Sequence, residues 1–189
     1  MTRISPVPSD ALSPDTAELL STRPPYNIYR ILANAPTLLP GFVQLAGALL
    51  TKTELDAQLR EMVILRVGAL CGSAYEIHQH TRLARYVGVT EERIRKALSL
   101  DDADGGVHGE RAEDILLRFT DSVVRDVKAP ASQFEAVKDL LSPRQLTELL
   151  LTIGTYMMVS RVLENLEVEI EPDGVDIISN GYYPSTPRF

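Results

Sequence analysis

Cysteine is almost absent from this sequence of 189 residues, in which Cys71 is the only one. A single cysteine cannot form a disulfide within the chain, so nothing indicates an oxidising compartment. No apolar stretch reaches the roughly 18 residues that cross a bilayer, and residues 1–14 lack the apolar core of a signal peptide. These absences predict a cytoplasmic protein without a membrane partner.

Positive charge is in deficit, with 19 Lys and Arg against 26 Asp and Glu and a net charge of −7. A general nucleic-acid binder carries a basic patch, so we expect no nucleic-acid partner. Six of the acids lie between Val162 and Pro187, where no Lys or Arg occurs. This acidic run is either a solvated chain end or a tail that binds a partner.

Extended alternation of polar and apolar residues is also missing, so the sequence predicts no strand and an all-α fold. Seven of the twelve prolines fall in the first 40 residues. We therefore expect an N-terminal arm over 1–24, a single helical domain over 25–166 and an irregular acidic tail over 167–189. The predicted helices span residues 15–22, 26–35, 38–50, 55–71, 74–87, 91–98, 110–127, 132–141 and 144–166.

Helix boundaries follow from local signals. Thr90 is a predicted N-cap, Gly88 ends the helix before it, and Ser142 followed by Pro143 is typical of a helix start. Between residues 101 and 109 the chain is polar and contains glycine, which predicts a loop.

From Met62 to Cys71 the predicted helix is apolar on nearly every side, as expected of a buried central helix. On a helical projection, Glu61 shares a flank with small neighbours, which leave room for a ligand or for another helix. A buried carboxylate must be paired or have a raised pKa. Glu61 is therefore either a general acid or base or one half of a structural ion pair.

On the next helix, Glu76 and His80 lie four residues apart on the apolar face, whereas His78 falls on the opposite face with arginines. A carboxylate beside an imidazole can orient the ring and raise its pKa, so the two predict a proton-transfer pair. Two plainer interpretations stay open. Ser73 and Glu76 fit a capping box, and His80 fits a satisfied core histidine.

No metal site is predicted. On a helix, the side chains of His78 and His80 diverge by about 200°, so they cannot hold the same ion. Cys71 fits a small buried residue better than a nucleophile, because it is the chain's only cysteine. The five basic residues between Arg82 and Lys96 form either an anion site or a solvated face. No organic cofactor is expected.

Three stretches of the sequence form a further pattern. The stretches are Leu59-Arg60-Glu61-Met62-Val63-Ile64-Leu65-Arg66-Val67, Gly72-Ser73-Ala74-Tyr75-Glu76-Ile77-His78-Gln79-His80 and Ala84-Arg85-Tyr86-Val87-Gly88-Val89. Together they resemble the carboxymuconolactone decarboxylase / alkylhydroperoxidase D (AhpD-like) superfamily. The string Tyr75-Glu76-x-x-x-His80 and its spacing from Glu61 make the resemblance specific.

The resemblance implies an all-helical fold that assembles as a homo-oligomer, a trimer or a hexamer. In the peroxidase branch of the family, a Cys-x-x-Cys-x-x-x-His motif works with an upstream Glu in a proton relay. That His matches His80 and that Glu matches Glu61, but the two cysteines match Ser73 and Glu76. A dithiol cannot form, so the chain resembles the cysteine-less, decarboxylase-like branch.

The predicted function is therefore acid–base chemistry, a decarboxylation or a proton shift, on a small organic acid or lactone. His80 is the predicted acid or base, Glu76 orients it or shares its proton, and Glu61 is a second acid or base. The predicted substrate-binding residues are Arg66, Tyr75 and Phe42. The alternatives are an AhpD-like peroxidase, a redox enzyme that uses Cys71 alone, and a non-catalytic oligomeric scaffold.

Overall fold

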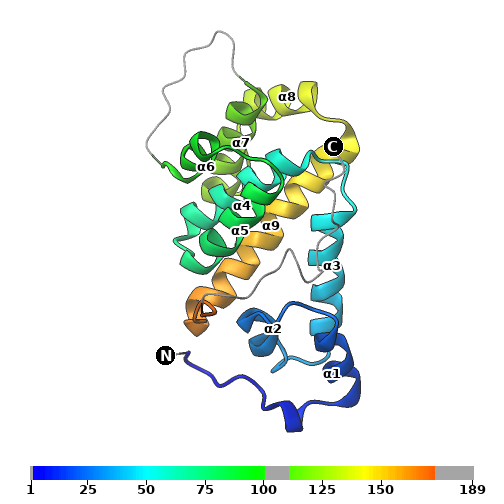
Figure 1. Ribbon diagram of the computed structural model, residues 1–189. Coiled ribbons are helices and arrows are strands. Elements are labelled where there is room, and N and C mark those ends of the chain that lie inside the picture. The colour runs from blue at the N-terminus through cyan, green and yellow to red at the C-terminus, as the bar shows by residue number, and fades with distance from the viewer. Residues whose placement is uncertain (1, 101–110, 173–189) are drawn as a thin grey trace. The chain divides into compact units, whose positions relative to one another are not determined.

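The computed structural model describes residues 2–100 and 111–172, which form helices joined by short connections, with no strand in these ranges (Figure 1). The all-α prediction is confirmed. The predicted loop over 101–109, the helix start predicted at Glu110 and the acidic tail from residue 173 onward lie outside the described residues.

The chain divides into two compact units. The first contains the residues up to Lys52 and the described residues from Val162 onward, and the second runs from Thr53 to Arg161. The division into an arm over 1–24, a domain over 25–166 and a tail over 167–189 stays a prediction. All three residues of the predicted catalytic trio, Glu61, Glu76 and His80, belong to the second unit.

The first unit holds the N-terminal helices. Leu39, Val43 and Ala33 are buried at the centre of its apolar cluster. The chain that follows the last helix is tied to this unit, since the side chain of Asn27 donates a hydrogen bond of 2.9 Å to the Glu169 carbonyl. The elements are the 3₁₀ helix η1 (Ser9–Ala11), α1 (Pro14–Ser21), α2 (Asn27–Leu32) and α3 (Leu39–Thr51).

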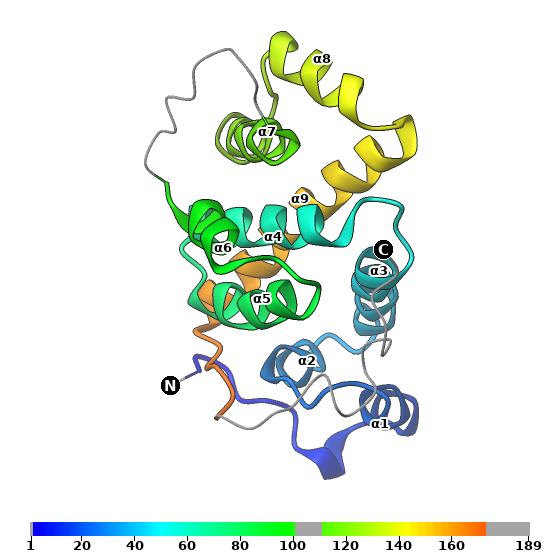
Figure 2. The same ribbon diagram turned by 45° about the horizontal axis from the view of Figure 1, so that its top comes forward.

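The second unit is built around α4, which packs against α5, α6 and α7. Figure 2 shows α4 between α7 on one side and α5 on the other. The helices are α4 (Ala57–Cys71), α5 (Ala74–Tyr86), α6 (Glu91–Leu98), α7 (Ala112–Asp126), α8 (Ala131–Leu140) and α9 (Pro143–Leu166), the last of which belongs to this unit up to Arg161.

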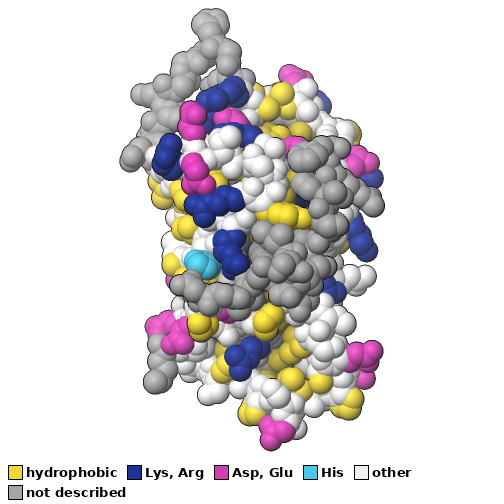
Figure 3. Space-filling model, viewed as in Figure 1, with side chains coloured by type: hydrophobic (Ala, Val, Ile, Leu, Met, Phe, Trp, Pro, Cys, Tyr) yellow, Lys and Arg dark blue, Asp and Glu magenta, His cyan; other side chains and the backbone are white. Residues whose placement is uncertain are grey.

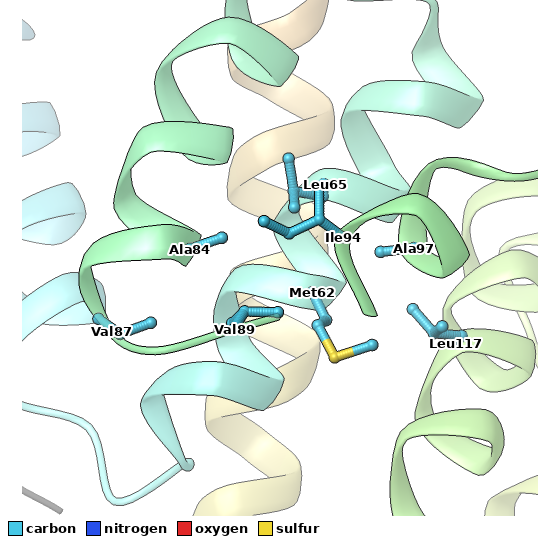
Figure 4. Close-up of a cluster of buried hydrophobic side chains, with 8 residues drawn as sticks. All are labelled: Met62, Leu65, Ala84, Val87, Val89, Ile94, Ala97 and Leu117. Atoms are coloured by element: carbon cyan, nitrogen blue, oxygen red, sulfur yellow. The ribbon is translucent and has the colours of Figure 1, made fainter. Parts of the chain in front are cut away.

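Helix α4 is the buried central helix that its sequence predicts. Asp56 caps its first turn by accepting a hydrogen bond of 2.9 Å from the Leu59 N–H, and Gly72 ends it with a φ of 67°. All residues from Glu61 to Gly68 are buried within the single chain. Around α4 lies an apolar cluster (Figure 4) that consists of Met62, Leu65, Ala84, Val87, Val89, Ile94, Ala97 and Leu117.

Two predicted helix starts are confirmed. The Thr90 hydroxyl accepts a hydrogen bond from the Arg93 N–H, and α6 begins directly after Thr90. Ser142 and Gln145 form a reciprocal capping box, in which each side chain accepts the other's backbone N–H at 3.2 Å and 3.0 Å. Short sequence signals therefore fix these two starts without help from distant residues.

Helix α9 is the one described helix that is long and apolar enough to cross a membrane by length and composition alone. It has 24 residues, and its most apolar 18-residue window reaches a mean hydropathy of 1.3, although 44% of that window is buried inside the protein. The window contains polar residues such as Thr152, and the expectation of no membrane partner stays a prediction. Leu149 and Ile153 are fully buried, while Leu151 and Met158 are exposed by 50% and 45%.

Gly68 sets the closest approach of α4 to α5. A Cβ atom added there would lie 3.3 Å from the Glu76 Cβ and 3.4 Å from the Ile77 Cγ1, both on α5. By contrast, a Cβ added at Gly154 of α9 would meet no atom within 4 Å. Gly68 therefore lets the helix that carries Glu61 lie against the helix that carries Glu76.

We expect Gly154→Ala to raise the free energy of unfolding by about 0.5–1 kcal/mol, because alanine is the better helix former. Gly68→Ala should not raise the free energy of unfolding, because the added methyl group overpacks the α4–α5 contact at a cost of about 1–3 kcal/mol. Urea unfolding of both variants measures the difference. Equal stabilisation of the two would contradict a tight α4–α5 contact at Gly68.

Candidate active site

Three titratable side chains from two helices meet inside the second unit. Oε2 of Glu61, on α4, lies 2.7 Å from Nδ1 of His80, on α5. Oε2 of Glu76, one turn before His80, lies 3.5 Å from Nε2 of the same ring. Each imidazole nitrogen therefore faces a carboxyl group, and the structure brings together all three residues of the predicted catalytic trio.

The trio is buried to different degrees. Glu61 has an exposed fraction of 0%, whereas Glu76 and His80 keep 4% and 6%. All three side chains are therefore buried within the chain, and that of Glu61 completely. His78, on the same helix, is only partly buried, in line with its predicted outward face.

Arg60 is the fourth charged member of the site, and the sequence analysis gave it no role. Its guanidinium donates from Nε and Nη2 to Oε1 of Glu61 at 3.4 Å and 3.3 Å. Side chains one residue apart on a helix do not face each other, so spacing gave no signal for this pair. The length of the arginine side chain makes the contact possible.

Tyr156 closes the site from α9. Its ring meets the His80 ring edge to face, with 4.7 Å between centroids and an interplanar angle of 88°. The contact fixes the plane of the imidazole between its two carboxyl neighbours.

The capping box predicted at the start of α5 is not formed. Ser73 is the N-cap residue, but its side chain makes no capping hydrogen bond. Within the described part of the chain, the buried Ser73 Oγ has no hydrogen-bond partner. The Glu76 carboxyl lies beside the imidazole instead, where it has a partner that can carry charge.

Burial is the main cause of the raised pKa of Glu76. It raises the pKa of this carboxyl from 4.5 to about 7, with His80 opposing the shift and Glu61 adding to it. Burial lowers the pKa of His80, but the charge and hydrogen bond of Glu61, together with the charge of Glu76, outweigh it and raise the pKa overall. The site thus holds a carboxyl that gains and loses a proton near neutral pH.

The predicted substrate-binding residues are spread over the fold. Arg66 donates two hydrogen bonds of 2.5 Å to Asp121 on α7 and a third to the Ser99 carbonyl, so its guanidinium ties α4 to α7 and to the end of α6. Tyr75 is buried on α5. Phe42 lies on α3 in the first unit, edge to face with Tyr29.

Three of the five residues in the basic stretch form ion pairs with nearby carboxylates. Arg93 lies 2.7 Å and Lys96 3.3 Å from the Glu113 carboxylate, and the exposed Arg85 lies 2.6 Å from Glu91. Figure 3 shows basic and acidic side chains intermixed over the region of α6. Among the residues that the structure describes, no group of three or more His, Cys, Asp or Glu is arranged to hold a metal ion.

Comparison with solved structures shows the same fold. The AhpD-core, peroxidase-related protein of Ralstonia eutropha has a TM-score of 0.76 at 15% identity, over 93% of this chain and 95% of its own. A peroxidase-related protein of Silicibacter also has a TM-score of 0.76 at 15% identity, over 91% and 93% of the two chains. The debrominase Bmp8, solved with 2,3,4-tribromopyrrole, has a TM-score of 0.70 at 17% identity, over 90% and 92%.

These likenesses define the class as an AhpD-like helical fold. Residues 36–115 also match the model of the carboxymuconolactone decarboxylase family, and no curated protein sequence matches the chain. The match to the family model spans less than half of the chain, so residues 36–115 are similar to that family and the fold is that of the AhpD-like structures. The matched residues include Glu61, Glu76 and His80.

The raised pKa of Glu76 makes folding stability depend on pH. The folded state holds this proton more tightly than the unfolded state, so the contribution is complete below pH 4.5 and is lost as pH rises through about 7. From pH 5 to pH 8, we expect the wild type to lose about 2–3 kcal/mol through this group, and Glu76→Gln to lose none of it. Urea unfolding at the two pH values checks this.

Glu92→Gln is the matched control, because Glu92 is exposed on α6. It should follow the wild type at both pH values. An unchanged pH dependence in Glu76→Gln would show that Glu76 titrates alike in the folded and unfolded chains.

Proposed function

We propose that this protein is an acid–base enzyme that catalyses a decarboxylation or a proton shift on a small organic acid or lactone. The observation that carries the proposal is the His80 ring held between two carboxyl groups, one of which has a pKa of about 7. General acid–base catalysis is most effective when the pKa of the catalytic group lies near the working pH.

The different partners of the two carboxyl groups support different roles. Glu61 is fully buried and hydrogen-bonded to His80, so it acts as a positioning residue that keeps the ring oriented. Glu76 is also buried, but its Oε2 has no hydrogen-bond partner in the described part of the chain, so this carboxyl is the one that exchanges its proton with the substrate. His80, beside Glu76, then restores the proton.

In a decarboxylation, the bond to the departing carboxylate breaks, CO₂ leaves, and its electron pair forms an enolate next to a carbonyl. The enolate carbon then takes a proton from Glu76, and His80 passes one to the Glu76 carboxylate. A proton shift uses the same groups, with Glu76 first removing the proton beside the carbonyl. Both reactions need a group that donates a proton and regains one near neutral pH, and the Glu76–His80 pair supplies it.

Relatives of the same fold suggest other chemistry. Two neighbours are described as peroxidase-related and one is a debrominase, and a single fold supports many reactions. In this chain Ser73 and Glu76 stand where the resemblance places the two cysteines, and Cys71 is the only thiol. A dithiol mechanism is therefore not available, which favours the acid–base function.

The test is proton exchange in D₂O, followed by NMR on a panel of lactones and keto acids. We expect the wild type to replace the hydrogen beside a carbonyl, or to release CO₂, for at least one panel member. Glu76→Gln should slow that reaction by about 10²- to 10⁴-fold, the usual contribution of a general acid or base. Circular dichroism of the variant confirms that it folds.

Cys71→Ser and Glu92→Gln serve as controls and should keep the wild-type rate. Loss of activity in Cys71→Ser would favour a redox enzyme over the acid–base enzyme. A wild type that exchanges no member of the panel, with Glu76→Gln differing only in stability, would favour the scaffold.

We also propose that the protein forms a homo-oligomer, a trimer or a hexamer, in the cytoplasm. Support comes from α9, on which Leu151 and Met158 lie seven residues apart on one face and are exposed by 50% and 45%, with Leu150 exposed by 38% on the flank beside them. Isolated exposed apolar residues are ordinary, but three on one helix form a face that a second copy can cover. The apolar surface of α4 does not require a second copy, because the single chain already buries that helix.

Leu151→Glu should reduce the number of subunits in the oligomer, because burying a charged side chain in a contact between copies costs free energy. Light scattering after size-exclusion chromatography measures the mass. Leu140→Glu, on the exposed end of α8, is the control and should keep the wild-type mass. Recovery of the wild type in the membrane fraction would instead assign the α9 face to lipid.

A further inference from the structure

Arg60 has more hydrogen-bonding capacity than the structure uses. A guanidinium carries five N–H groups, and that of Arg60 donates only to Oε1 of Glu61 within the described part of the chain. The two distances, 3.4 Å and 3.3 Å, are long for a charge-assisted pair, which is typically 2.7–2.9 Å. Most of its donors are therefore available for another acceptor.

The surroundings of Arg60 favour an anion as that acceptor. Its side chain is 6% exposed, so the charge is almost removed from water, yet the group is not sealed off. Buried charges are stable when opposite charges and hydrogen bonds surround them. When Glu76 holds its proton, the charges of Arg60 and His80 are opposed only by the Glu61 carboxylate among these four side chains. One net positive charge is left.

Glu61 also places Arg60 next to the reacting groups. One carboxylate oxygen accepts from Arg60, and the other lies 2.7 Å from the His80 ring. Arg60 and His80 therefore share one carboxylate, and Glu61 links an anion held by Arg60 to the imidazole. Arg66, the arginine that sequence analysis selected for this task, already has its guanidinium occupied by Asp121 and the Ser99 carbonyl.

We propose that Arg60 binds the carboxylate of an anionic substrate and holds the molecule beside His80 and Glu76. This inference rests on the proposed function, for which it names the substrate's anchoring group. A planar guanidinium matches a carboxylate with two parallel hydrogen bonds, which a lysine ammonium cannot reproduce. The site therefore selects substrates that keep a free carboxylate at the position that Arg60 binds.

The test uses acetate and benzoate as probes and needs no turnover. Protein labelled with ¹⁵N-histidine is titrated with each anion while the His80 signal, assigned by its loss in His80→Gln, is followed. In the wild type we expect a saturable shift of that signal. In Arg60→Gln the dissociation constant should rise by about 10- to 100-fold, as expected for the loss of hydrogen bonds to a charged group.

Arg60→Lys is the second variant, because Arg60→Gln removes a partner of the buried Glu61 and can fail to fold. It keeps the charge but not the two-pronged donor, so we expect weakening by about 10-fold or less. Arg85→Gln, which removes an exposed arginine paired with Glu91, is the matched control and should bind both anions as the wild type does. Wild-type binding in Arg60→Lys and Arg60→Gln would overturn the inference.

This outcome is separable from failure of the proposed function. Anion binding that depends on Arg60, in a protein that exchanges no substrate proton, would keep the anion site and reject the enzyme. The opposite result is also possible: the exchange depends on Glu76, its KM is the same in Arg60→Lys as in the wild type, and neither anion binds. That result would support the enzyme and reject Arg60 as the group that anchors its substrate.

Discussion

The interaction on which the rest of the site depends is the hydrogen bond of 2.7 Å between Glu61 on α4 and Nδ1 of His80 on α5. It joins two helices at the centre of the second unit and places a charged group where no water reaches it, since Glu61 is fully buried. Such a carboxylate is tolerated only because cationic partners surround it. Its two oxygens are divided between Arg60 and His80, so the same carboxylate orients the ring and holds the arginine.

Backbone packing makes this arrangement possible. Gly68 allows α4 to lie against α5 within van der Waals distance of the Glu76 Cβ. The apolar cluster of Met62, Leu65 and their neighbours fixes α4 against α5, α6 and α7 (Figure 4). Because the helices are held by this packing, the polar side chains between them have little freedom to find other partners. Burial then raises the pKa of Glu76 to about 7, and a structural carboxylate becomes one that titrates near neutral pH.

The same fold carries relatives described as peroxidase-related proteins and a debrominase. In this chain the thiol positions implied by the family resemblance hold Ser73 and Glu76, so Glu61 and His80 are kept without the dithiol. Ser73 keeps its place at the N-cap of α5, but its hydroxyl is buried without a partner in the described part of the chain. The polar groups around His80 are better suited to moving protons and binding a polar ligand than to exchanging electrons.

From the sequence alone, helical periodicity and capping residues determined the all-α fold, the buried character of α4 and the starts at Thr90 and Ser142, because these depend on neighbours within a few residues. The spacing of Glu76 and His80 on one helix face also followed from local geometry. Tertiary structure decided what spacing cannot show. It placed Glu61 against His80, gave Arg60 a place in the site and directed Arg66 to Asp121 instead. It also decided that Glu76 would not cap α5. Each of these depends on which helices pack together. Each also depends on which long side chains pair with the few charged groups that are buried.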